Sequence, residues 1–503
     1  MFLKYFSIFT IFSVVSALLS IICQAYFALK HLNTVTTILA SLLAIENLGH
    51  GGLANPKQKV AVGYGACVDL IVNGTTFLNF SDFAVGNEEN FYIDDVTNYK
   101  EFIQSFGYYF KNGAAAERFT PDKFFFQNLV NKAKTEHDVK WVLGGNAPVM
   151  GIRFLAEGCN VLLGSRMSTK LRKHLPENIQ LIGNEVDEDD IHLILEYKAN
   201  EEWGDLIAPR ANRYILHNDK NNPQLSTLEE FGETLKKFKP KLLVVSGLQM
   251  MDSYKYESGV REERLEKLRK QISAQPKSTL IHFEMASYVE LKLLQLLSEN
   301  ILPYSDSIGM NEQELDNLQK VLSDGQISFA SDSNPRVATA LDQMRKIFFI
   351  INSNYLQNRA KNSNCRMLTR MHVHTLAYQA ILTVNDSQWT NNKLGAAKAA
   401  LTANRYVCDS DRINPDAATL ILDESFATSA NGIEFDVNMP KRMQLDPKDP
   451  VPCWNESMVF SKFKNEKILF QICVAPVLVC RIAKKTAGAG DNISASGLSH
   501  QIW

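Results

Sequence analysis

The sequence has no excess of either charge, no C-x-x-C cysteine pair and no internal repeat. Its 503 residues carry a formal net charge of −2, which excludes a strongly basic surface and predicts no nucleic-acid partner. The irregular spacing of its eight cysteines argues against a zinc site or a dense disulfide framework. Low-complexity tracts are also lacking, and a hydrophobic content of 45% argues against disorder. These absences leave a large globular protein with a substantial core.

The first thirty residues differ from the rest of the chain. The run from Tyr5 to Leu29 has no charged side chain and follows Lys4. It is long enough to span a bilayer as a helix, and it lacks the amphipathic period of a helix at a protein core. We therefore expect residues 1–30 to be either a cleaved signal peptide or an uncleaved membrane anchor. Both alternatives place the remaining chain in the secretory pathway, in the endoplasmic reticulum lumen or outside the cell.

Sequons and cysteines are consistent with this route. The chain has five Asn-x-Ser/Thr sequons, at Asn73, Asn79, Asn385, Asn455 and Asn492. We expect Asn492 to be unmodified because it lies inside a glycine-rich motif. Disulfide pairing among Cys365, Cys408 and Cys453 is expected in an oxidising lumen.

Strand and helix patterns alternate through the middle of the chain. Apolar runs predict strands over 59–74, 241–248, 278–284 and 305–310. Amphipathic runs predict helices over 261–275, 288–300 and 311–324. This order predicts an α/β fold with a mainly parallel central sheet between helices, whose strand carboxyl ends share one edge.

Two regions depart from this alternation and predict a smaller lid. Residues 73–126 are rich in aromatic residues and Asn, and residues 180–220 contain several short alternating stretches. We expect both regions to form a smaller α/β lid, with the large domain made by the remainder of 59–503. Residues 31–58 are expected to be a linker between the leader and this folded unit.

Three acidic residues, Glu284, Glu314 and Asp491, follow predicted strands. At the shared edge of a parallel sheet they would meet where open α/β sheets bind ligands, and such a cluster suits Mg²⁺. Each also has a purely structural interpretation. Asn311 and Glu314 match a capping box, Glu284 could sit at a helix N-terminus, and the Gly-Ala-Gly-Asp sequence could be a simple turn.

The stretch KKTAGAGDNISASG, residues 484–497, follows a long apolar run. It is no P-loop, because no Gly-Lys-Ser/Thr follows, and Ile493 replaces the third glycine of a dinucleotide fingerprint. Its glycines would still let backbone N–H groups approach a phosphate at a helix N-terminus. Asp491 in the same turn could accept a proton from an attacking hydroxyl. The motif therefore predicts phosphoryl transfer to an alcohol.

From about Val60 to its C-terminus, the chain resembles the ADP-dependent glucokinases of the ribokinase-like superfamily, in their animal, secretory-pathway branch. The motifs that carry the resemblance, in the family order, are GGNAPVMG, DIHLILEY, APRANRYILHND, HFEMAS, GMNEQE, RMHVHTL and TAGAGDNIS. The resemblance implies a ribokinase-like fold that transfers the β-phosphate of ADP to glucose. The products would be glucose 6-phosphate and AMP, and one Mg²⁺ per subunit would be required.

The resemblance also implies a role for each matching residue. Asp491 would be the catalytic base, and the anion hole would consist of Ala487, Gly488, Ala489 and Gly490. Mg²⁺ would be served by Glu284, Glu314 and Asp491. Glucose would contact Asp69, Glu117, Gly145, Asn146 and His192. The nucleotide would contact Asn311, His374 and Thr375.

Several alternatives stay open at this point. Asp69 alone could be a turn residue, and His192 alone could be a satisfied structural histidine. An ADP-dependent fructose-6-phosphate kinase would need a cluster of Arg or Lys near the sugar pocket, and no obvious cluster is present beside Asp69 or Glu117. An ATP-dependent relative and a catalytically silent secretory glycoprotein are the other candidates, although the intact acidic residues speak against the latter. The near-neutral charge and self-contained sheet favour a monomer.

Overall fold

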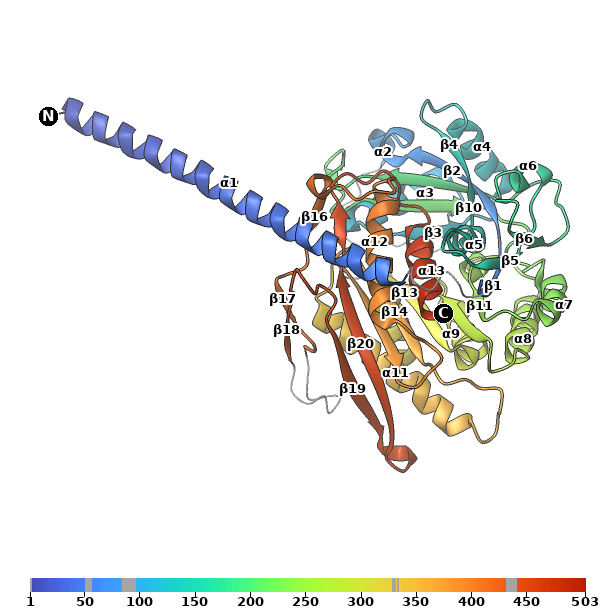
Figure 1. Ribbon diagram of the computed structural model, residues 1–503. Coiled ribbons are helices and arrows are strands. Elements are labelled where there is room, and N and C mark those ends of the chain that lie inside the picture. Colours follow the sequence, from blue (N-terminus) through green and yellow to red (C-terminus); the bar gives the residue numbers. More distant parts are fainter. Residues whose placement is uncertain (1, 50–56, 84–95, 328–331, 333, 431–440) are drawn as a thin grey trace.

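The alternating strands of the sequence form a large, mostly parallel sheet (Figure 1). The computed structural model describes residues 2–49, 57–83, 96–327, 332, 334–430 and 441–503, with side chains from residue 14 onward. Among these residues the sheet has ten strands, in the order β19-β20-β15-β14-β13-β12-β11-β1-β5-β6. Strands β14 to β6 along this order are parallel, and β15, β20 and β19 extend the sheet in antiparallel fashion.

The strands of the large sheet are β1 (Lys59–Gly63), β5 (Asn160–Gly164), β6 (Gln180–Ile182), β11 (Leu242–Val245), β12 (Leu280–Glu284), β13 (Ser307–Asn311), β14 (Arg370–His374), β15 (Tyr378–Val384), β19 (Cys453–Phe460) and β20 (Glu466–Pro476). The sheet confirms the predicted α/β fold class with a mainly parallel centre. The strands predicted over 241–248, 278–284 and 305–310 are confirmed as β11, β12 and β13.

Helices cover both faces of this sheet. Alternate side chains of β1 point to opposite faces, so Ala61 joins one core cluster while Val60 and Val62 join another. The Ala61 side is covered by α7 (Leu228–Phe238), α8 (Val260–Ser273), α9 (Leu291–Asn300), α10 (Glu312–Asp324) and α11 (Val337–Asn358). The opposite side is covered by α5 (Asn146–Ala156), α12 (Asn392–Val407) and α13 (Ala489–Gln501). Helices α8, α9 and α10 confirm the amphipathic helices predicted from the sequence.

The predicted first strand over 59–74 is instead two strands in two different sheets. Strand β1 ends at Gly63, and β2 (Cys67–Asn73) begins a second sheet. Gly65 lies between them with φ +81°, a conformation that an L side chain rarely adopts. The chain therefore turns out of the large sheet at this point, and Asp69 belongs to the smaller one.

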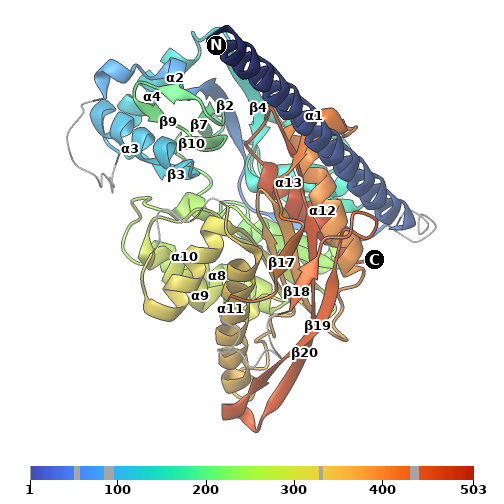
Figure 2. The same ribbon diagram turned by 90° about the vertical axis from the view of Figure 1, so that its left-hand side faces the viewer.

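The smaller sheet carries its own helices and lies beside the large one (Figure 2). In the described chain its five strands are ordered β3-β10-β7-β2-β4, with β3 (Ala116–Phe119), β4 (Lys140–Gly144), β7 (Ile191–Tyr197) and β10 (Asn212–His217). Aromatic side chains fill its core, which explains the aromatic composition of this region. Strand β4 lies outside the ranges 73–126 and 180–220, and helix α4 (Lys123–Ala133) begins inside the first range but extends beyond it. Strand β6, inside the second range, pairs with the large sheet. The helices beside it are α2 (Gly74–Phe77) and α3 (Tyr99–Asn112).

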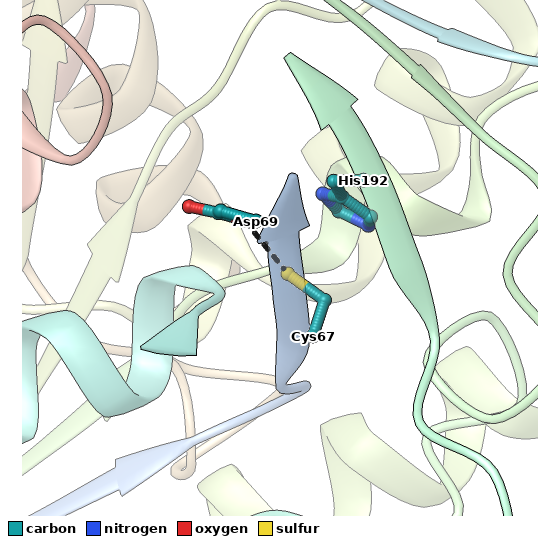
Figure 3. A group of neighbouring side chains, drawn as sticks. All are labelled: Cys67, Asp69 and His192. Carbon is teal, nitrogen blue, oxygen red and sulfur yellow. Dashed lines mark hydrogen bonds between the residues drawn. The ribbon is translucent and has the colours of Figure 1, made fainter. Parts of the chain in front are cut away.

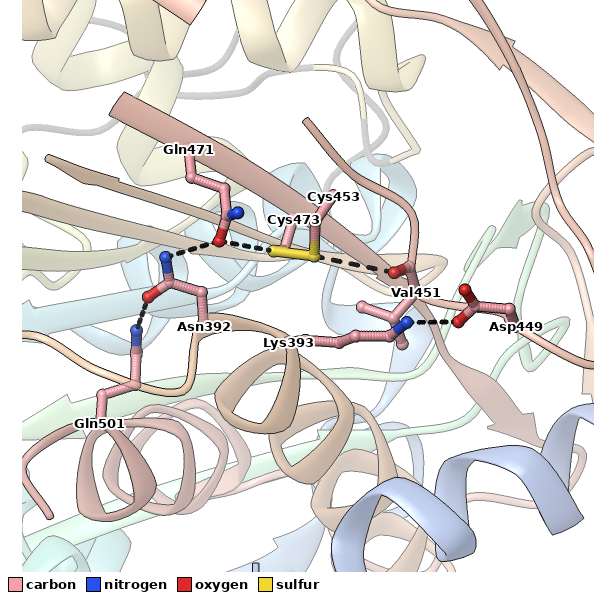
Figure 4. Close-up of a disulfide and its surroundings, with 8 residues drawn as sticks. All are labelled: Asn392, Lys393, Asp449, Val451, Cys453, Gln471, Cys473 and Gln501. Atoms are coloured by element: carbon pink, nitrogen blue, oxygen red, sulfur yellow. Dashed lines mark hydrogen bonds and ion pairs between the residues drawn. A yellow bond between two sulfur atoms is a disulfide. The ribbon is translucent and has the colours of Figure 1, made fainter. Parts of the chain in front are cut away.

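Strand β20 leads toward the glycine motif, but it is not the parallel strand expected before Asp491. It pairs antiparallel with β15 and β19 because a long hairpin extends the sheet at this edge. A disulfide joins Cys453 of β19 to Cys473 of β20 (Figure 4). Next to it, the side chain of Asn392 bridges β20 to the end of α13: its amide donates to Gln471 at 3.0 Å and its carbonyl oxygen accepts from Gln501 at 2.9 Å.

The second disulfide joins Cys408 to Cys480. The expectation of pairing among Cys365, Cys408 and Cys453 is therefore wrong, since Cys365 is free and the other two pair elsewhere. The spacing of the cysteines in sequence does not indicate these partners. Cys453 and Cys473 face each other on the antiparallel strands β19 and β20, and Cys408 lies at the end of α12. Small elements complete the fold: α6 (Thr169–Arg172), β8 (Glu202–Trp203), β9 (Leu206–Ile207), β16 (Ala418–Leu420), β17 (Ser425–Ala427), β18 (Arg442–Gln444), β21 (Leu478–Cys480), η2 (Phe80–Asp82), η3 (Leu248–Met251), η4 (Leu302–Tyr304), η5 (Pro415–Ala417) and η6 (Ser461–Phe463).

The N-terminal segment is a single helix, α1 (Phe2–Gly49), which projects from the body of the protein (Figure 1). Its described part from residue 14 is long and apolar enough to cross a membrane, and the most apolar window is fully exposed. Residues 31–49, predicted as linker, instead continue the helix. The linker prediction failed because it relied on the turn-forming residues after position 49. Residues 50–56 of that linker lie outside the described residues.

Candidate active site

The two sheets meet around a cavity of about 490 Å³. From the large sheet, Glu284 at the end of β12 and Asn311 at the end of β13 line it. From the smaller sheet, Glu117 of β3 and Arg213 of β10 line it, and Asp491 of α13 completes the wall. The cavity therefore combines carboxyl ends of parallel strands with a helix N-terminus, as expected for a ligand site in an open α/β sheet.

The glycine motif forms the N-terminus of α13. Gly488 is the N-cap residue with φ +71°, and Asp491 lies in the first turn. A Cβ at Gly490 would lie 2.9 Å from Cε1 of His374, so this position requires glycine. Asn492 donates to the carbonyl of Gly488 at 2.9 Å, which holds the turn closed. The backbone N–H groups of this turn point toward any anion placed before the helix.

Asp491 is a buried carboxyl group with an unusual proton affinity. Burial, together with the nearby Glu284 carboxylate, raises its pKa to about 6. The side-chain amide of Asn146 donates to Asp491 Oδ1 at 2.9 Å and lowers the pKa. Gln249 in turn donates to Asn146 Oδ1 at 2.6 Å, which fixes the amide so that its NH₂ group faces Asp491. A carboxylate with this pKa can accept a proton near neutral pH.

Glu284 and Glu314 line the same cavity but already have partners in the protein. Glu284 Oε2 lies 2.7 Å from His282 Nε2 and accepts from Ser494 Oγ at 2.6 Å. Glu314 completes the capping box predicted as an alternative: its two oxygens accept from the backbone N–H and the side-chain amide of Asn311, both at 2.9 Å. Burial raises the pKa of Glu314 to about 7.

The three acidic residues do not form a tight set of donor atoms. Among the described residues, the groups whose ligand atoms lie within 4.8 Å of one another are two others, Cys67–Asp69–His192 and His192–His217–Asp219. Glu284, Glu314 and Asp491 share the cavity wall, and the Glu284 charge raises the pKa values of the other two. They could therefore hold a hydrated cation across the cavity more readily than a dehydrated one.

Glu117 and Asp69 mark the side of the cavity nearer the smaller sheet. Glu117 Oε1 is buried and has no hydrogen-bond partner among the described residues, although the side chain faces the cavity. Burial raises the pKa of Asp69 to about 6. A Cβ at Gly144 would lie 1.9 Å from Asp69 Oδ1, so glycine is required for the carboxylate to occupy this place.

His192 lies beside Asp69 and Cys67 in the interior of the smaller sheet (Figure 3). Its Nε2 is 3.0 Å from both oxygens of Asp219, and its Nδ1 is 3.8 Å from Glu117 Oε1. Burial opposes the charged imidazolium, but Asp219 raises the pKa of His192 to about 10. A protonated His192 has no free lone pair for a metal ion, so the cluster is a buried charge pair next to Glu117.

The structure brings most of the predicted site residues to one cavity. The residues that line it are Glu117, Asn146, Glu284, Asn311, Glu314, His374, Thr375, Ala489, Gly490 and Asp491. The predicted residues that are not among the described residues lining it are Asp69, Gly145, His192, Ala487 and Gly488. Their roles toward a ligand stay predictions, because proximity alone assigns no contact.

Several residues at the cavity escaped the sequence analysis. Lys198, Arg210 and Arg213 bring positive charge from the smaller sheet, although Arg210 is paired with Glu312 at 2.6 Å. The search for cations beside Asp69 and Glu117 in sequence missed them, because strand pairing brings them there from about a hundred residues away. The charge of Arg213 lowers the pKa values of both Asp491 and Asp69, so its guanidinium acts electrostatically on both carboxyl groups.

Glu196 was also missed, although it lies in the DIHLILEY motif. Its Oε1 accepts from the Thr486 backbone N–H at 3.0 Å, from Thr486 Oγ1 at 2.5 Å and from the Ala487 N–H at 3.4 Å. Through these hydrogen bonds, Glu196 of β7, the central strand of the smaller sheet, holds the glycine motif that precedes α13. The signal available in the sequence was a lone acidic residue in a strand, which is too common to single out.

Comparisons with known proteins agree with this geometry. The family described as ADP-specific Phosphofructokinase/Glucokinase conserved region matches residues 58–500. An ADP-dependent glucokinase of Bos taurus is 33% identical over 445 residues, which cover 88% of this chain and 84% of that protein. An ADP-specific phosphofructokinase of Thermococcus litoralis is 24% identical over 342 residues, 63% of this chain and 64% of that protein.

A solved structure shares the fold. It is an ADP-dependent kinase in complex with fructose-6-phosphate and ADPβS, with a TM-score of 0.60 and 17% sequence identity. The match covers 93% of this chain and 97% of that one. It shows that both sheets belong to one known architecture.

Proposed function

Because the chain belongs to the ADP-specific phosphofructokinase/glucokinase family, we propose that it transfers the β-phosphate of ADP to the 6-hydroxyl of glucose and releases AMP. Membership in the family makes it a sugar phosphotransferase. The relative with 33% identity supports glucose as the acceptor. The observation that carries the proposal is Asp491, a buried carboxyl at a helix N-terminus facing a cavity lined by both sheets.

The acceptor sugar would lie on the side of Glu117 and Asn146. Glu117 Oε1 lies 3.8 Å from His192 Nδ1 and has no hydrogen-bond partner among the described residues, so it can accept a hydrogen bond from a sugar hydroxyl. Asp69 and His192 support this wall from behind. Asp491 would accept the proton of the 6-hydroxyl as its oxygen attacks phosphorus, while the P–O bond to AMP breaks. The Gln249–Asn146 hydrogen bond orients the amide that holds Asp491.

The donor would lie along the glycine motif. The N-terminal end of α13, where Ala489 and Gly490 line the cavity, favours negative charge on the phosphoryl group. Arg213 adds a positive side chain from the smaller sheet. Asn311, His374 and Thr375 would line the nucleotide subsite at the ends of β13 and β14. We further propose that the smaller sheet acts as a lid that excludes water from this cavity.

The residues present fit a Mg²⁺ ion bound through water. Carboxylate oxygens of Glu284, Glu314 and Asp491 face one cavity, and hard oxygen donors suit this ion. When bound, Mg²⁺ would neutralise part of the diphosphate charge. Glu284 is held in place by His282 and Ser494, and Glu314 by Asn311. The two glutamates would therefore present carboxylate oxygens in fixed orientations to the hydrated ion.

The proposed reaction can be separated from its alternatives by a donor–acceptor matrix. Full-length protein purified in detergent would be assayed with glucose or fructose 6-phosphate, each with ADP or ATP, by following AMP and sugar phosphate. We expect turnover with glucose and ADP to exceed every other pair. Faster turnover with fructose 6-phosphate would assign Lys198 and Arg210 to the acceptor phosphate instead. A folded sample without turnover for any pair would favour a silent protein.

Glu314→Gln is expected to raise the Mg²⁺ concentration that gives half-maximal activity by about tenfold, through loss of one charge from the cavity. Glutamine keeps the length of the side chain and one acceptor oxygen, so the capping box is largely retained. The measurement is initial rate against free Mg²⁺, with the exposed Glu299→Gln as the control. An unchanged Mg²⁺ dependence would leave Glu314 a helix cap only.

Glu196→Ala is expected to lower kcat about tenfold with little change in the KM for glucose, because the loop that faces the phosphoryl group loses its fastening. The control is Glu201→Ala, which removes a carboxylate bonded to Asn73 and Thr75 within the smaller domain only. Thermal unfolding would be followed for both variants. If Glu196→Ala lowered the unfolding temperature but left kcat intact, its role would be structural.

The proposed location is the secretory pathway. Two disulfides within the described chain favour an oxidising compartment, and α1 supplies an apolar segment for targeting. Three sequon asparagines, Asn79, Asn385 and Asn455, are exposed. The side chain of Asn73 caps α2 and donates a hydrogen bond to Glu201. The side chain of Asn492 is buried and accepts a hydrogen bond from Arg153 at 2.9 Å. We therefore propose glycans on the exposed sites alone.

A further inference from the structure

Helix α1 has two halves with opposite environments. Between Val14 and Leu29 the helix is exposed and apolar, without contact to the body of the protein. After about residue 31 the same helix lies along α12, and Val35, Ile38, Leu39 and Leu42 are buried there. These four positions share one face of the helix at the spacing of an amphipathic stripe. The second half is therefore a packed element of the catalytic body.

A buried acidic residue fixes this docked half. Glu46 is 5% exposed, and its Oε1 lies 2.7 Å from both Lys398 Nζ and Arg405 Nη1 on α12. Its Oε2 accepts from Arg405 Nη2 at 2.8 Å. Burial alone would raise the pKa of Glu46, but the two cations lower it to about 2. Removing Glu46 would leave Arg405 without this carboxylate partner and would leave Lys398 with Glu157 alone, in a site that is largely buried.

The ion-pair network continues from Glu46 toward the glycine motif. Lys398 also lies 3.0 Å from Glu157, which pairs with Arg153 at 3.4 Å on α5. Arg153 donates through Nε to Asn492 at 2.9 Å, the residue that follows Asp491. Polar contacts at the other end tie the helix down as well, since Ser41 donates to the carbonyl of Pro447 at 2.9 Å. The docked half thus belongs to the same connected structure as the active site.

We propose that α1 is retained in the mature protein as a membrane anchor whose second half is a structural part of the kinase body. The run Tyr5–Leu29 has 25 residues and no charge, which gives about 37 Å of helix and suffices to cross a bilayer. Glu46 lies about 25 Å further along the axis, outside the hydrocarbon layer. A lipid bilayer is the partner that fits an exposed, uncharged helix of this length continuous with a docked segment.

This arrangement favours retention of the apolar run. The helix continues without a break from that run into residues 31–49, which pack against α12, so the two parts form one structural element. The rigid continuation of the spanning helix into the body would also hold the domain at a fixed distance from the membrane. This inference rests on the proposed secretory route and is independent of the proposed activity.

The test uses the full chain with one epitope at each end, expressed in cultured animal cells. We expect both epitopes on one glycosylated species that stays in the membrane pellet after alkaline carbonate extraction. A glycosylated species without the N-terminal epitope would overturn the inference while leaving the secretory route intact. An unglycosylated, carbonate-soluble species with both epitopes would overturn the secretory route and the anchor together.

A second measurement addresses the docking directly. In detergent-solubilised full chain, Glu46→Ala should lower the unfolding temperature by about 3–5 °C, because a buried ion network loses its central carboxylate. Leu48→Ala, on the exposed face of the same helix, should leave it unchanged. Equal unfolding temperatures for wild type and Glu46→Ala would show that the second half is not docked.

Discussion

Asp491→Asn is expected to lower kcat at least about 100-fold while glucose and ADP still bind. Asparagine fills the same space and can still accept the hydrogen bond from Asn146, but it cannot take a proton from the attacking hydroxyl. The measurement combines steady-state kinetics with calorimetric binding of each substrate. The control is Asp409→Asn, which alters an exposed aspartate paired with Lys485 and should leave kcat near the wild-type value.

The raised pKa of Asp491 gives this prediction two further readouts. In the free wild-type enzyme, kcat/KM should fall as pH drops below about 6, because the protonated carboxyl is no longer a base. The folded state holds this proton more tightly than the unfolded chain does. The free energy of unfolding therefore falls as pH rises from the ordinary aspartate pKa of 3.8 to the folded value of about 6, and it stays lower above that pH. At pH 8, Asp491→Asn should therefore be as stable as wild type or more so. Wild-type turnover in this variant would contradict its role as the base.

Arg213→Met is expected to lower kcat about 100- to 1,000-fold, through loss of positive charge beside the transferred phosphoryl group. The side chain lines the cavity, and its charge already lowers the pKa values of Asp491 and Asp69. Methionine retains most of the apolar stem but none of the charge. Rates at saturating ADP and glucose would separate an effect on the chemical step from weaker binding.

Two variants control this second prediction. Arg213→Lys keeps the charge but loses the forked donor geometry, so it should recover part of the activity. Arg172→Met removes an exposed arginine on α6 and should be neutral. A raised KM for fructose 6-phosphate with an unchanged rate on glucose would instead place Arg213 at an acceptor phosphate.

The local patterns in the sequence were sufficient for much of the fold. The runs that became β11, α8, β12, α9, β13 and α10 each carry their own period, and each formed the predicted element. The break between β1 and β2 was missed, because Gly65 looks like one glycine among several in an apolar stretch. The antiparallel direction of β20 was missed because strand propensity carries no information on partner direction.

The residues of the candidate site likewise fall into those that could be identified from the sequence and those that could not. Asp491, Glu284 and Asn311 could be singled out because glycine loops and strand ends have recognisable local chemistry. Arg213, Gln249 and Glu196 could not, because each is an ordinary polar residue that acts through a partner distant in the chain. Glu314 both completes the capping box of α10 and lines the cavity, so the two interpretations of this residue do not exclude each other.

Local patterns were enough to identify the alternating α/β plan, the glycine turn before Asp491 and an uncharged N-terminal run long enough for a bilayer. The cysteine partners, the cations at the cavity and the docking of residues 31–49 on α12 through Glu46 became visible only in the folded protein. The difference lies in how far apart along the chain the interacting residues are. Hydrophobic period and turn chemistry act over a few neighbouring residues, whereas Glu46 and Lys398 meet across 352 positions only after the whole chain has packed.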